Sequence, residues 1–331
     1  MPDTVRYGLV STARIGFTAH VPAAKDSPNS EIVAVSSRNL ETAQAAAKEH
    51  DIPLAFGSYQ EMIDSDQIDA VINTLPNSMH HEWTIKAAEA GKHILCEKPL
   101  SATMAEAREM KAAAEANNVV LVEAFTPRWT RQLRSIRELV ANREIGDIIH
   151  LESSVMYPLA NPDDIRLTKT LAGGSLMDVG CYSLYALRYV MNSEPIKVMA
   201  FDRKRDGVDV DTVLHGLLQF ANGAVGDIWC GFDGPRHGSL GVVGTRGSIS
   251  LDRAAVVETA EVTVTRADQK PEVLEMTSTN RYQVQLDEFS ECVLTGKTPE
   301  FPADDALRNM ASILALYESV DTGCAVEVEQ I

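Results

Sequence analysis

The sequence lacks the features that support a disulfide framework, a metal cluster or a membrane segment. Its five cysteines, at positions 96, 181, 230, 292 and 324, form neither a Cys-x-x-Cys pair nor a cluster with histidine. We therefore predict a cytoplasmic protein without a bound metal. No apolar run approaches the length of a bilayer span, and residues 1–6 contain no basic segment leading into a signal-type apolar core.

Positive charge is also scarce. The chain has 30 lysines and arginines against 47 aspartates and glutamates, a formal net charge of −17. Proteins that bind nucleic acid need a basic surface to neutralise phosphates, and anionic membrane surfaces attract the same basic groups. Neither is an expected partner. The length of 331 residues and the hydrophobic content of 45% suit a two-domain globular protein.

Residues 1–123 alternate between strand and helix patterns. Apolar runs predict strands at 5–10, 31–35, 69–74, 93–96 and 119–123, with helices beginning near Phe17 and covering 41–50, 59–64, 83–90 and 103–117. Gly91 is placed to end one helix, and Thr103 with Glu106 forms a capping box that opens the next. This alternation predicts a doubly wound parallel sheet, the Rossmann type of α/β nucleotide-binding domain.

The turn after the first strand matches a dinucleotide fingerprint in part. Ser11, Ala13 and Gly16 occupy the three glycine positions of G-x-G-x-x-G. Small residues there still permit a tight turn and a close approach of a pyrophosphate to a helix N-terminus. Because two of the glycines are replaced, the motif by itself is weak.

The end of the second strand indicates which nicotinamide cofactor is used. Ser36-Ser37-Arg38 stands where an acidic residue would bind a ribose 2′-hydroxyl. Hydroxyls and a guanidinium favour a 2′-phosphate instead, so we predict NADP rather than NAD. Taken alone, a serine and arginine that merely open a helix fit the same residues equally well.

The stretch around Lys98 is central to the interpretation. The apolar strand at 93–96 runs into Glu97-Lys98-Pro99, and Pro99 cannot continue a ladder. A lysine at the carboxyl end of a parallel strand lies at the mouth of the sheet, where α/β folds bind ligands. A Lys–Glu pair that faces water is the alternative for an isolated tripeptide.

The pattern changes in residues 124–331. Strands are expected at 148–157, 198–202, 212–220, 225–232, 239–243 and 248–251, with helices at 131–142, 182–191, 282–294 and 304–320. Successive strands without intervening helices indicate a second, α+β domain with a mostly antiparallel sheet. His93, His150 and His215 fall in strand-like runs and are interpreted as structural.

A second candidate for chemistry spans residues 172–182. Gly173 and Gly174 precede Asp178 and Tyr182, whose spacing of four places both on one face if the segment is helical. An acidic helix start with a buried tyrosine explains the same residues without any chemistry, and is the usual reading of such a segment.

Together these stretches resemble the glucose–fructose oxidoreductase/inositol dehydrogenase/MocA family over nearly the whole chain. The residues that carry the resemblance are Ser11 to Gly16, Thr74-Leu-Pro-Asn77-x-x-His80, Gly91-Lys-His93, Glu97-Lys98-Pro99, Arg128, Gly173-Gly174-x-Leu-x-Asp178-x-Gly180-x-Tyr182 and Gly244-Thr-Arg-Gly247. The resemblance implies a Rossmann domain followed by a domain with a large, open-faced sheet. It also implies a homodimer or homotetramer assembled through that open face.

The resemblance further implies site residues. Lys98 and Tyr182 would be the catalytic residues that carry proton transfer, supported by Asp178. Lys98, Arg166, Asp178 and Tyr182 would bind substrate, and a cap on the following loop explains Arg166 equally well. Many relatives have histidine at position 182, and the tyrosine here resembles the branch of dimeric dihydrodiol dehydrogenase and NADP-dependent xylose dehydrogenase. The residues implied to bind the cofactor are Ser11, Thr12, Ala13, Arg14, Ile15, Ser37, Arg38, Thr74, Leu75, Asn77, His80, Glu97, Lys98 and Arg128.

The chemistry of these residues suits alcohol oxidation, which needs hydride loss to nicotinamide and proton loss to a base. A tyrosine titrates near ~10, and an adjacent ammonium lowers that value and favours the phenolate. No Tyr-x-x-x-Lys occurs, which weighs against a short-chain dehydrogenase. We expect an NADP(H)-dependent oxidoreductase of aldoses or related cyclic polyols and diols. Reduction of a dicarbonyl or anhydro-sugar and a catalytically silent NADP-binding regulator are the alternatives.

Overall fold

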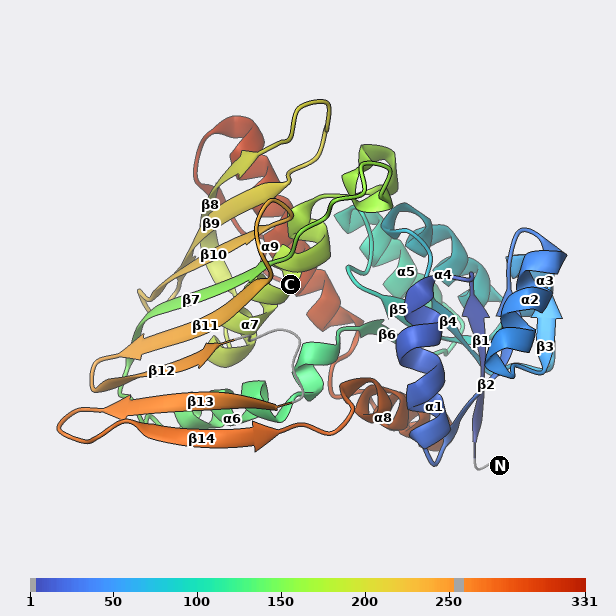
Figure 1. Cartoon of the computed structure of the whole chain (residues 1–331), viewed down its shortest axis with the longest axis horizontal. Helices are drawn as coiled ribbons and strands as arrows, with labels where there is room; N and C mark the ends of the chain where they lie inside the picture. Colours follow the sequence, from blue (N-terminus) through green and yellow to red (C-terminus); the bar gives the residue numbers. More distant parts are fainter. Residues whose placement is uncertain (1–3, 253–258) are drawn as a thin grey trace. The chain divides into compact units, whose positions relative to one another are not determined.

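The structure, a computed structural model, describes residues 4–252 and 259–331 as two compact units (Figure 1). The first unit comprises the chain up to Thr126 together with Asn280–Leu307, and the second comprises Pro127–Thr279 with Arg308–Ile331. The sequence interpretation placed a boundary after residue 123 and assigned everything beyond it to the second domain. The structure differs because Leu286 and Phe289 of helix α8 (Arg281–Thr295) are buried in the core of the first unit.

The first unit contains the expected parallel sheet. Its strands are β1 (Val5–Val10), β2 (Ser30–Ser36), β3 (Leu54–Phe56), β4 (Ala70–Asn73), β5 (His93–Glu97) and β6 (Leu121–Ala124). The order is β3-β2-β1-β4-β5-β6, and every neighbouring pair is parallel. The sequence analysis missed β3, whose three residues are too few to show a strand period.

Helices cover both faces of this sheet (Figure 1). One face packs against α3 (Tyr59–Ile63), α4 (His80–Glu89) and α5 (Met104–Ala116), and the other against α1 (Val21–Asp26), α2 (Leu40–His50) and α8. The predicted capping box is present, because Thr103 accepts from the Glu106 N–H and Glu106 accepts from the Thr103 N–H. Gly91 follows α4 with a φ of 71°, a conformation that favours glycine.

The second unit is built on a nine-stranded sheet with the order β14-β13-β12-β11-β7-β10-β9-β8-β15. Its strands are β7 (Ile148–Met156), β8 (Pro195–Arg203), β9 (Val213–Phe220), β10 (Val225–Gly231), β11 (His237–Gly244), β12 (Gly247–Asp252), β13 (Thr259–Arg266), β14 (Glu272–Thr277) and β15 (Val326–Glu327). Only β7 and β10 pair in parallel, so the prediction of a mostly antiparallel sheet is confirmed. Strands β13, β14 and β15 were not predicted.

The helices of this unit are α6 (Arg131–Ala141), α7 (Cys181–Met191) and most of α9 (Ala303–Thr322). Along β9 and β10 alternate residues are buried, as expected for a sheet with one covered face. The opposite face carries large exposed apolar side chains, those of Phe201, Leu217, Val225 and Val243. Within the described residues, no helix is long and apolar enough to cross a membrane.

Candidate functional site

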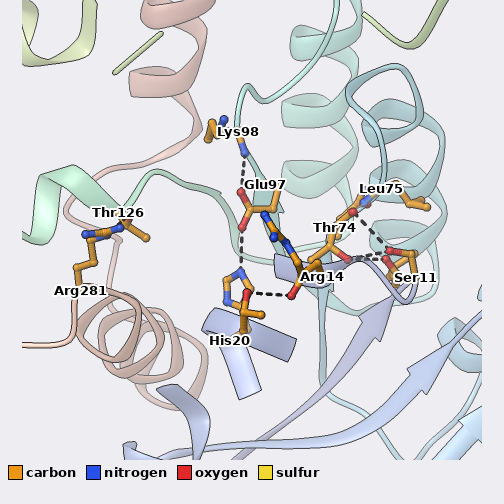
Figure 2. Close-up of polar contacts among 12 residues, drawn as sticks. Ser11, Arg14, His20, Thr74, Leu75, Glu97, Lys98, Thr126 and Arg281 are labelled. Carbon is orange, nitrogen blue, oxygen red and sulfur yellow. Dashed lines mark hydrogen bonds and ion pairs between the residues drawn. The ribbon is translucent and has the colours of Figure 1, made fainter. Parts of the chain in front are cut away.

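The first part of the candidate site lies at the carboxyl ends of β1 and β4. These strands are neighbours, although the chain visits β2 and β3 between them, so the strand order reverses at this point. The Ser11 Oγ lies 3.0 Å from the Thr74 Oγ1, and the Thr74 hydroxyl donates to the Val10 carbonyl at 2.9 Å (Figure 2). A reversal of strand order leaves a crevice at the carboxyl ends of the strands, and dinucleotides bind in this crevice.

The turn after β1 keeps the geometry of the glycine fingerprint although serine replaces the first glycine. Ser11 has a φ of 98°, a region that L-residues rarely adopt. The Ser11 hydroxyl offsets part of the cost of this backbone conformation, because its Oγ accepts a hydrogen bond from the Ala13 N–H at 3.1 Å. A Cβ on Gly16 would lie 3.3 Å from Leu9, so the third glycine still serves close packing of helix and strand. Thr12, Arg14 and Ile15 lie in the same turn and at the start of the helical segment that follows it.

The residues predicted to read the 2′ position follow β2. Ser36 is buried and donates to the Leu9 carbonyl at 3.1 Å, which ties β2 to β1. Ser37 is half-buried and Arg38 is exposed at the edge of the sheet. Arg38 also hydrogen-bonds Tyr59, whose pKa is raised by burial against the opposing effect of this arginine. An exposed guanidinium whose position is restrained by a tyrosine is suited to an anionic ligand.

Lys98 follows the carboxyl end of β5, as predicted, and β5 lies two strands from β1 in the sheet. The preceding Glu97 is held by a buried histidine, since its Oε1 lies 2.9 Å from the Nε2 of His20 (Figure 2). The other oxygen, Oε2, accepts from the Lys98 N–H at 3.4 Å. Glu97 therefore connects the first helical segment to the backbone of the candidate catalytic lysine.

The charge of Glu97 is maintained despite its burial. Burial raises the pKa of this carboxyl. The hydrogen bond and charge of His20, together with the charges of Lys98 and His80, lower the pKa by more than burial raises it, so the pKa of Glu97 lies below its ordinary value. The ring of Tyr282 meets His20 edge-on at 5.4 Å, and the pKa of Tyr282 is raised by burial and by Glu97. A carboxylate, a histidine, a lysine and a tyrosine thus share one polar cluster in the first unit.

His80 connects two turns of this site, and its side chain is not exposed at the site. Its side chain is completely buried, with Nδ1 3.0 Å from the Pro99 carbonyl and Nε2 2.9 Å from the Leu75 carbonyl. Burial lowers its pKa despite both carbonyls, which favours the neutral imidazole. The placement fits support of the turns that carry Leu75 and Lys98. Asn77 lies in the short helical turn η2 (Asn77–Met79) just before His80.

The second part of the candidate site lies within the second unit, around Asp178. The Tyr157 hydroxyl donates to Asp178 Oδ2 at 2.7 Å, and the Nε of Arg166 lies 3.0 Å from the same oxygen. Arg166 also reaches Asp164, whose Oδ1 is 3.2 Å from Nη1. Burial lowers the pKa of Arg166, but Asp178, Tyr157 and Asp164 raise it more, so the guanidinium is charged. Two of the residues implied to bind substrate, Arg166 and Asp178, are therefore in direct contact.

Asp178 and Tyr182 lie on consecutive helical segments, the π-helical turn η6 (Leu176–Gly180) and α7. The side chain of Asp178 is 16% exposed and Tyr182 is half-buried. Asp211 fixes the start of η6, because its Oδ2 accepts from the Ser175 hydroxyl at 2.6 Å and from the Leu176 N–H at 2.8 Å. Gly180 leaves no room for a side chain, since a Cβ there would lie 2.6 Å from the Cys230 sulfur.

Arg128 does not lie on an open surface of the second unit. Only 1% of the residue is exposed, and its guanidinium carbon is 5.1 Å from the ring centre of Tyr185. Stacking of this kind positions an arginine and contributes about 0.5–2 kcal/mol. The predicted contact of Arg128 with a cofactor stays a prediction.

Sequence reasoning did not identify several residues that complete these clusters: His20, Tyr282, Asp164 and Asp211. Their partners are distant in the sequence, as with His20 and Glu97, so no local spacing marks them. Tyr157 had been placed only at the end of the expected strand 148–157, and its bond to Asp178 has no sequence signal. For His20, the one hint in the sequence was its position just after the fingerprint turn.

Two family models match the chain. Residues 5–125 match an oxidoreductase family with an NAD-binding Rossmann fold, and residues 133–250 match the GFO/IDH/MocA C-terminal domain. Among curated proteins, the chain is 36% identical over 326 residues to D-xylose 1-dehydrogenase (NADP(+)) 2 of Haloferax volcanii, covering 98% of this chain and 99% of that protein.

Two further similarities cover most of the chain. Trans-1,2-dihydrobenzene-1,2-diol dehydrogenase of Sus scrofa is 31% identical over 251 residues, which is 75% of this chain and 74% of that protein. The crystal structure of aldose-aldose oxidoreductase from Caulobacter crescentus, complexed with glycerol, superposes with a TM-score of 0.92 at 27% identity. That similarity covers 98% of this chain and 100% of the other.

Proposed function

Because the chain belongs to the GFO/IDH/MocA oxidoreductase family, we propose that it transfers a hydride between NADP(H) and a CH–OH carbon of an aldose or a related cyclic polyol or diol. The observation that carries the proposal is the arrangement of adjacent strand ends in the first unit. Ser11 and Thr74 meet where the strand order reverses, and Lys98 follows the next strand along. This arrangement would place an ammonium beside the crevice that holds a dinucleotide.

The turn at Ser11 to Ile15 would hold the pyrophosphate, because it leads into a helical segment and the start of a helix favours an anion. Ser37 and Arg38 would bind the 2′-phosphate, consistent with the NADP named for the Haloferax relative. Thr74, Leu75, Asn77, Glu97 and Lys98 would line the cofactor crevice, with His80 supporting it from within the core. When bound, nicotinamide supplies the hydride acceptor or donor.

Proton transfer is assigned to Lys98 and Tyr182. An alcohol that loses a hydride must also lose its hydroxyl proton, and lysine and tyrosine are both side chains that can accept it. Asp178 is assigned a different task. Tyr157 and Arg166 hold its Oδ2 in place, so this carboxylate is suited to orient a substrate hydroxyl.

Sugars and diols fit this site chemically. Asp178, Arg166 and Tyr157 combine a charged acceptor, a charged donor and a hydroxyl, the set that binds polyhydroxylated molecules through several hydrogen bonds. The relatives named above act on D-xylose, a dihydrobenzene diol and aldoses. We extend that substrate class to this chain.

We also propose a homodimer or homotetramer formed through the open sheet face, and a cytoplasmic location. The exposed Phe201, Leu217, Val225 and Val243 side chains are the support for an interface. All five cysteines are free thiols, four of them buried, as is usual for a protein of a reducing compartment.

The test follows nicotinamide absorbance with NADP and NAD against D-xylose, D-glucose, myo-inositol and a trans-dihydrodiol, with dicarbonyls assayed in reverse. Lys98→Met and Tyr182→Phe should each lower kcat by about 100-fold or more, the lower end of the range for acid–base catalysis. The matched controls are Lys86→Met, which removes a half-buried lysine paired with Glu82, and Tyr189→Phe on the same helix as Tyr182. Full activity in both site variants would contradict the assignment.

The cofactor assignment has its own variant. Arg38→Ala should raise KM for NADP by about 10-fold or more and leave KM for NAD nearly unchanged, because only NADP carries the 2′-phosphate. Equal effects on the two cofactors would show that Arg38 does not read that position. Turnover by dicarbonyls alone would identify the protein as a reductase. Tight NADPH binding without turnover of any substrate would favour a regulator.

A further inference from the structure

The open face of the nine-stranded sheet carries a group of polar residues that the proposed reaction does not use. His150 and Glu152 of β7 and Asp227 of β10 point from the same face, because Glu152 pairs with Asp227 and His150 lies two residues before Glu152. One ligand atom from each of the three lies within 4.8 Å of the others. We propose that these residues form a binding site for a divalent transition-metal ion, with Zn²⁺ as the probe.

The geometry of the group suits such an ion. The Nε2 of His150 lies 3.2 Å from Asp227 Oδ1. Two ligands of a tetrahedral zinc ion, each bonded at about 2.1 Å, lie about 3.4 Å apart. One imidazole and two carboxylates select a borderline cation such as Zn²⁺ over Mg²⁺ or Ca²⁺, which prefer oxygen ligands. These three residues of the chain leave the fourth coordination position open.

The surroundings position the ligands. His215 of the adjacent strand β9 has its Nε2 3.8 Å from Asp227 Oδ2, so a second histidine faces the oxygen that His150 does not contact. On the other side, Gly241 of β11 leaves room for the Glu152 side chain. A Cβ at residue 241 would lie 2.8 Å from both Glu152 Cγ and Glu152 Oε1. The strands β11, β7, β10 and β9 are consecutive in the sheet, so the scaffold is rigid (Figure 1).

Charge is the second argument for a cation. Glu152 and Asp227 are directly cross-strand, an arrangement that is unfavourable for two carboxylates. In the described part of the chain, no lysine or arginine forms an ion pair with either of them. The face around them is apolar, with Leu217 and Val225 exposed nearby on β9 and β10. A bound cation would remove the repulsion.

From the sequence we predicted no bound metal, because its cysteines and histidines do not have the spacing of metal ligands. The proposed ligands come from two strands that are separated by about 75 residues of chain, so only the pairing of β7 with β10 brings them together. The proposal does not depend on the oxidoreductase activity.

The test is calorimetric titration of Zn²⁺ into the full chain after treatment with a chelator, with Mg²⁺ titrated separately. We expect about one Zn²⁺ per chain and no comparable binding of Mg²⁺. His150→Ala and Asp227→Asn should each weaken zinc binding at least 10-fold, the scale expected for loss of a ligand.

Two controls isolate the site. His81→Ala removes a half-buried histidine whose Nε2 lies 2.7 Å from Glu109 Oε2, a His–carboxylate pair with no third ligand atom close by among the described residues. His237→Ala removes a histidine of β11 that stacks on Trp229 at 4.9 Å. Both controls should bind zinc as the parent chain does.

Folding of each variant is checked by circular dichroism. Should His150→Ala or Asp227→Asn fail to fold, Gly241→Ala keeps every ligand but displaces Glu152, and it should also weaken zinc binding. Absence of stoichiometric zinc binding by the parent chain would overturn the proposal. Parent-like binding by the folded site variants would overturn it as well.

Discussion

Gly174→Ala is the most informative single change to the candidate substrate unit, because two separate costs act at one position. Gly174 has a φ of 122°, a region that disfavours any L side chain. A Cβ at this residue would also collide with Asp211 Oδ1 and lie 2.7 Å from the Tyr317 hydroxyl. The substitution therefore strains the backbone and displaces a buried carboxylate.

The second cost can be worked out from the contacts of Asp211. This carboxyl accepts from the Ser175 hydroxyl at 2.6 Å, the Leu176 N–H at 2.8 Å and the Tyr317 hydroxyl at 2.8 Å. Hydrogen bonds to a charged group contribute about 1.5–3 kcal/mol each. Backbone strain of this kind costs about 1–3 kcal/mol. With one hydrogen bond lost, Gly174→Ala should lower the free energy of unfolding by about 3–5 kcal/mol.

The measurement is urea unfolding followed by fluorescence and circular dichroism together, since a chain of two units need not unfold in one step. Gly207→Ala is the matched control. Gly207 has a φ of 77° with nothing within 4 Å of an added Cβ, so its change reports backbone strain without a collision. We expect a loss of about 1 kcal/mol there.

The reasoning also predicts an effect on function, because Asp211 caps the turn that carries Asp178. Gly174→Ala should lower kcat/KM more than Gly207→Ala does, at a temperature where both variants are folded. Equal losses of stability in the two variants would refute the role assigned to the Asp211 contacts.

Two further predictions concern the first unit. Ser11→Ala should destabilise the chain by about 1 kcal/mol more than Ser11→Gly. Both variants lose the hydroxyl, but only alanine keeps the strain of the positive φ. Equal stability of the two variants would show that the backbone at residue 11 is not strained. The pKa of Glu97 is lowered on folding, so its stabilising contribution is present above its ordinary pKa near 4.5 and is lost as pH falls through the lowered value. His20→Gln should therefore reduce the loss of unfolding free energy between about pH 5 and about pH 3, as measured by urea titrations. An unchanged pH dependence would contradict the coupling of His20 to Glu97.

Local patterns were sufficient for most of the secondary structure. Five of the six parallel strands, all except β3, were found because each is a short apolar run between turn residues, and α5 was bounded by the Thr103 capping box. The three exceptions in the second sheet were β13, β14 and β15, of which β15 has only two residues. Lys98 and Arg38 were also placed correctly, because topology alone puts the ends of parallel strands at one edge.

Tertiary packing decided the rest. The return of residues 280–307 to the first unit depends on Leu286 and Phe289 filling a core that the first 126 residues leave open. The bonds of Glu97 to His20 and of Asp178 to Tyr157 join residues far apart in the chain. The same holds for His150 and Asp227 on the open face. A sequence pattern records which residues share a strand or helix, whereas contacts between elements depend on register and packing, which only the folded chain specifies.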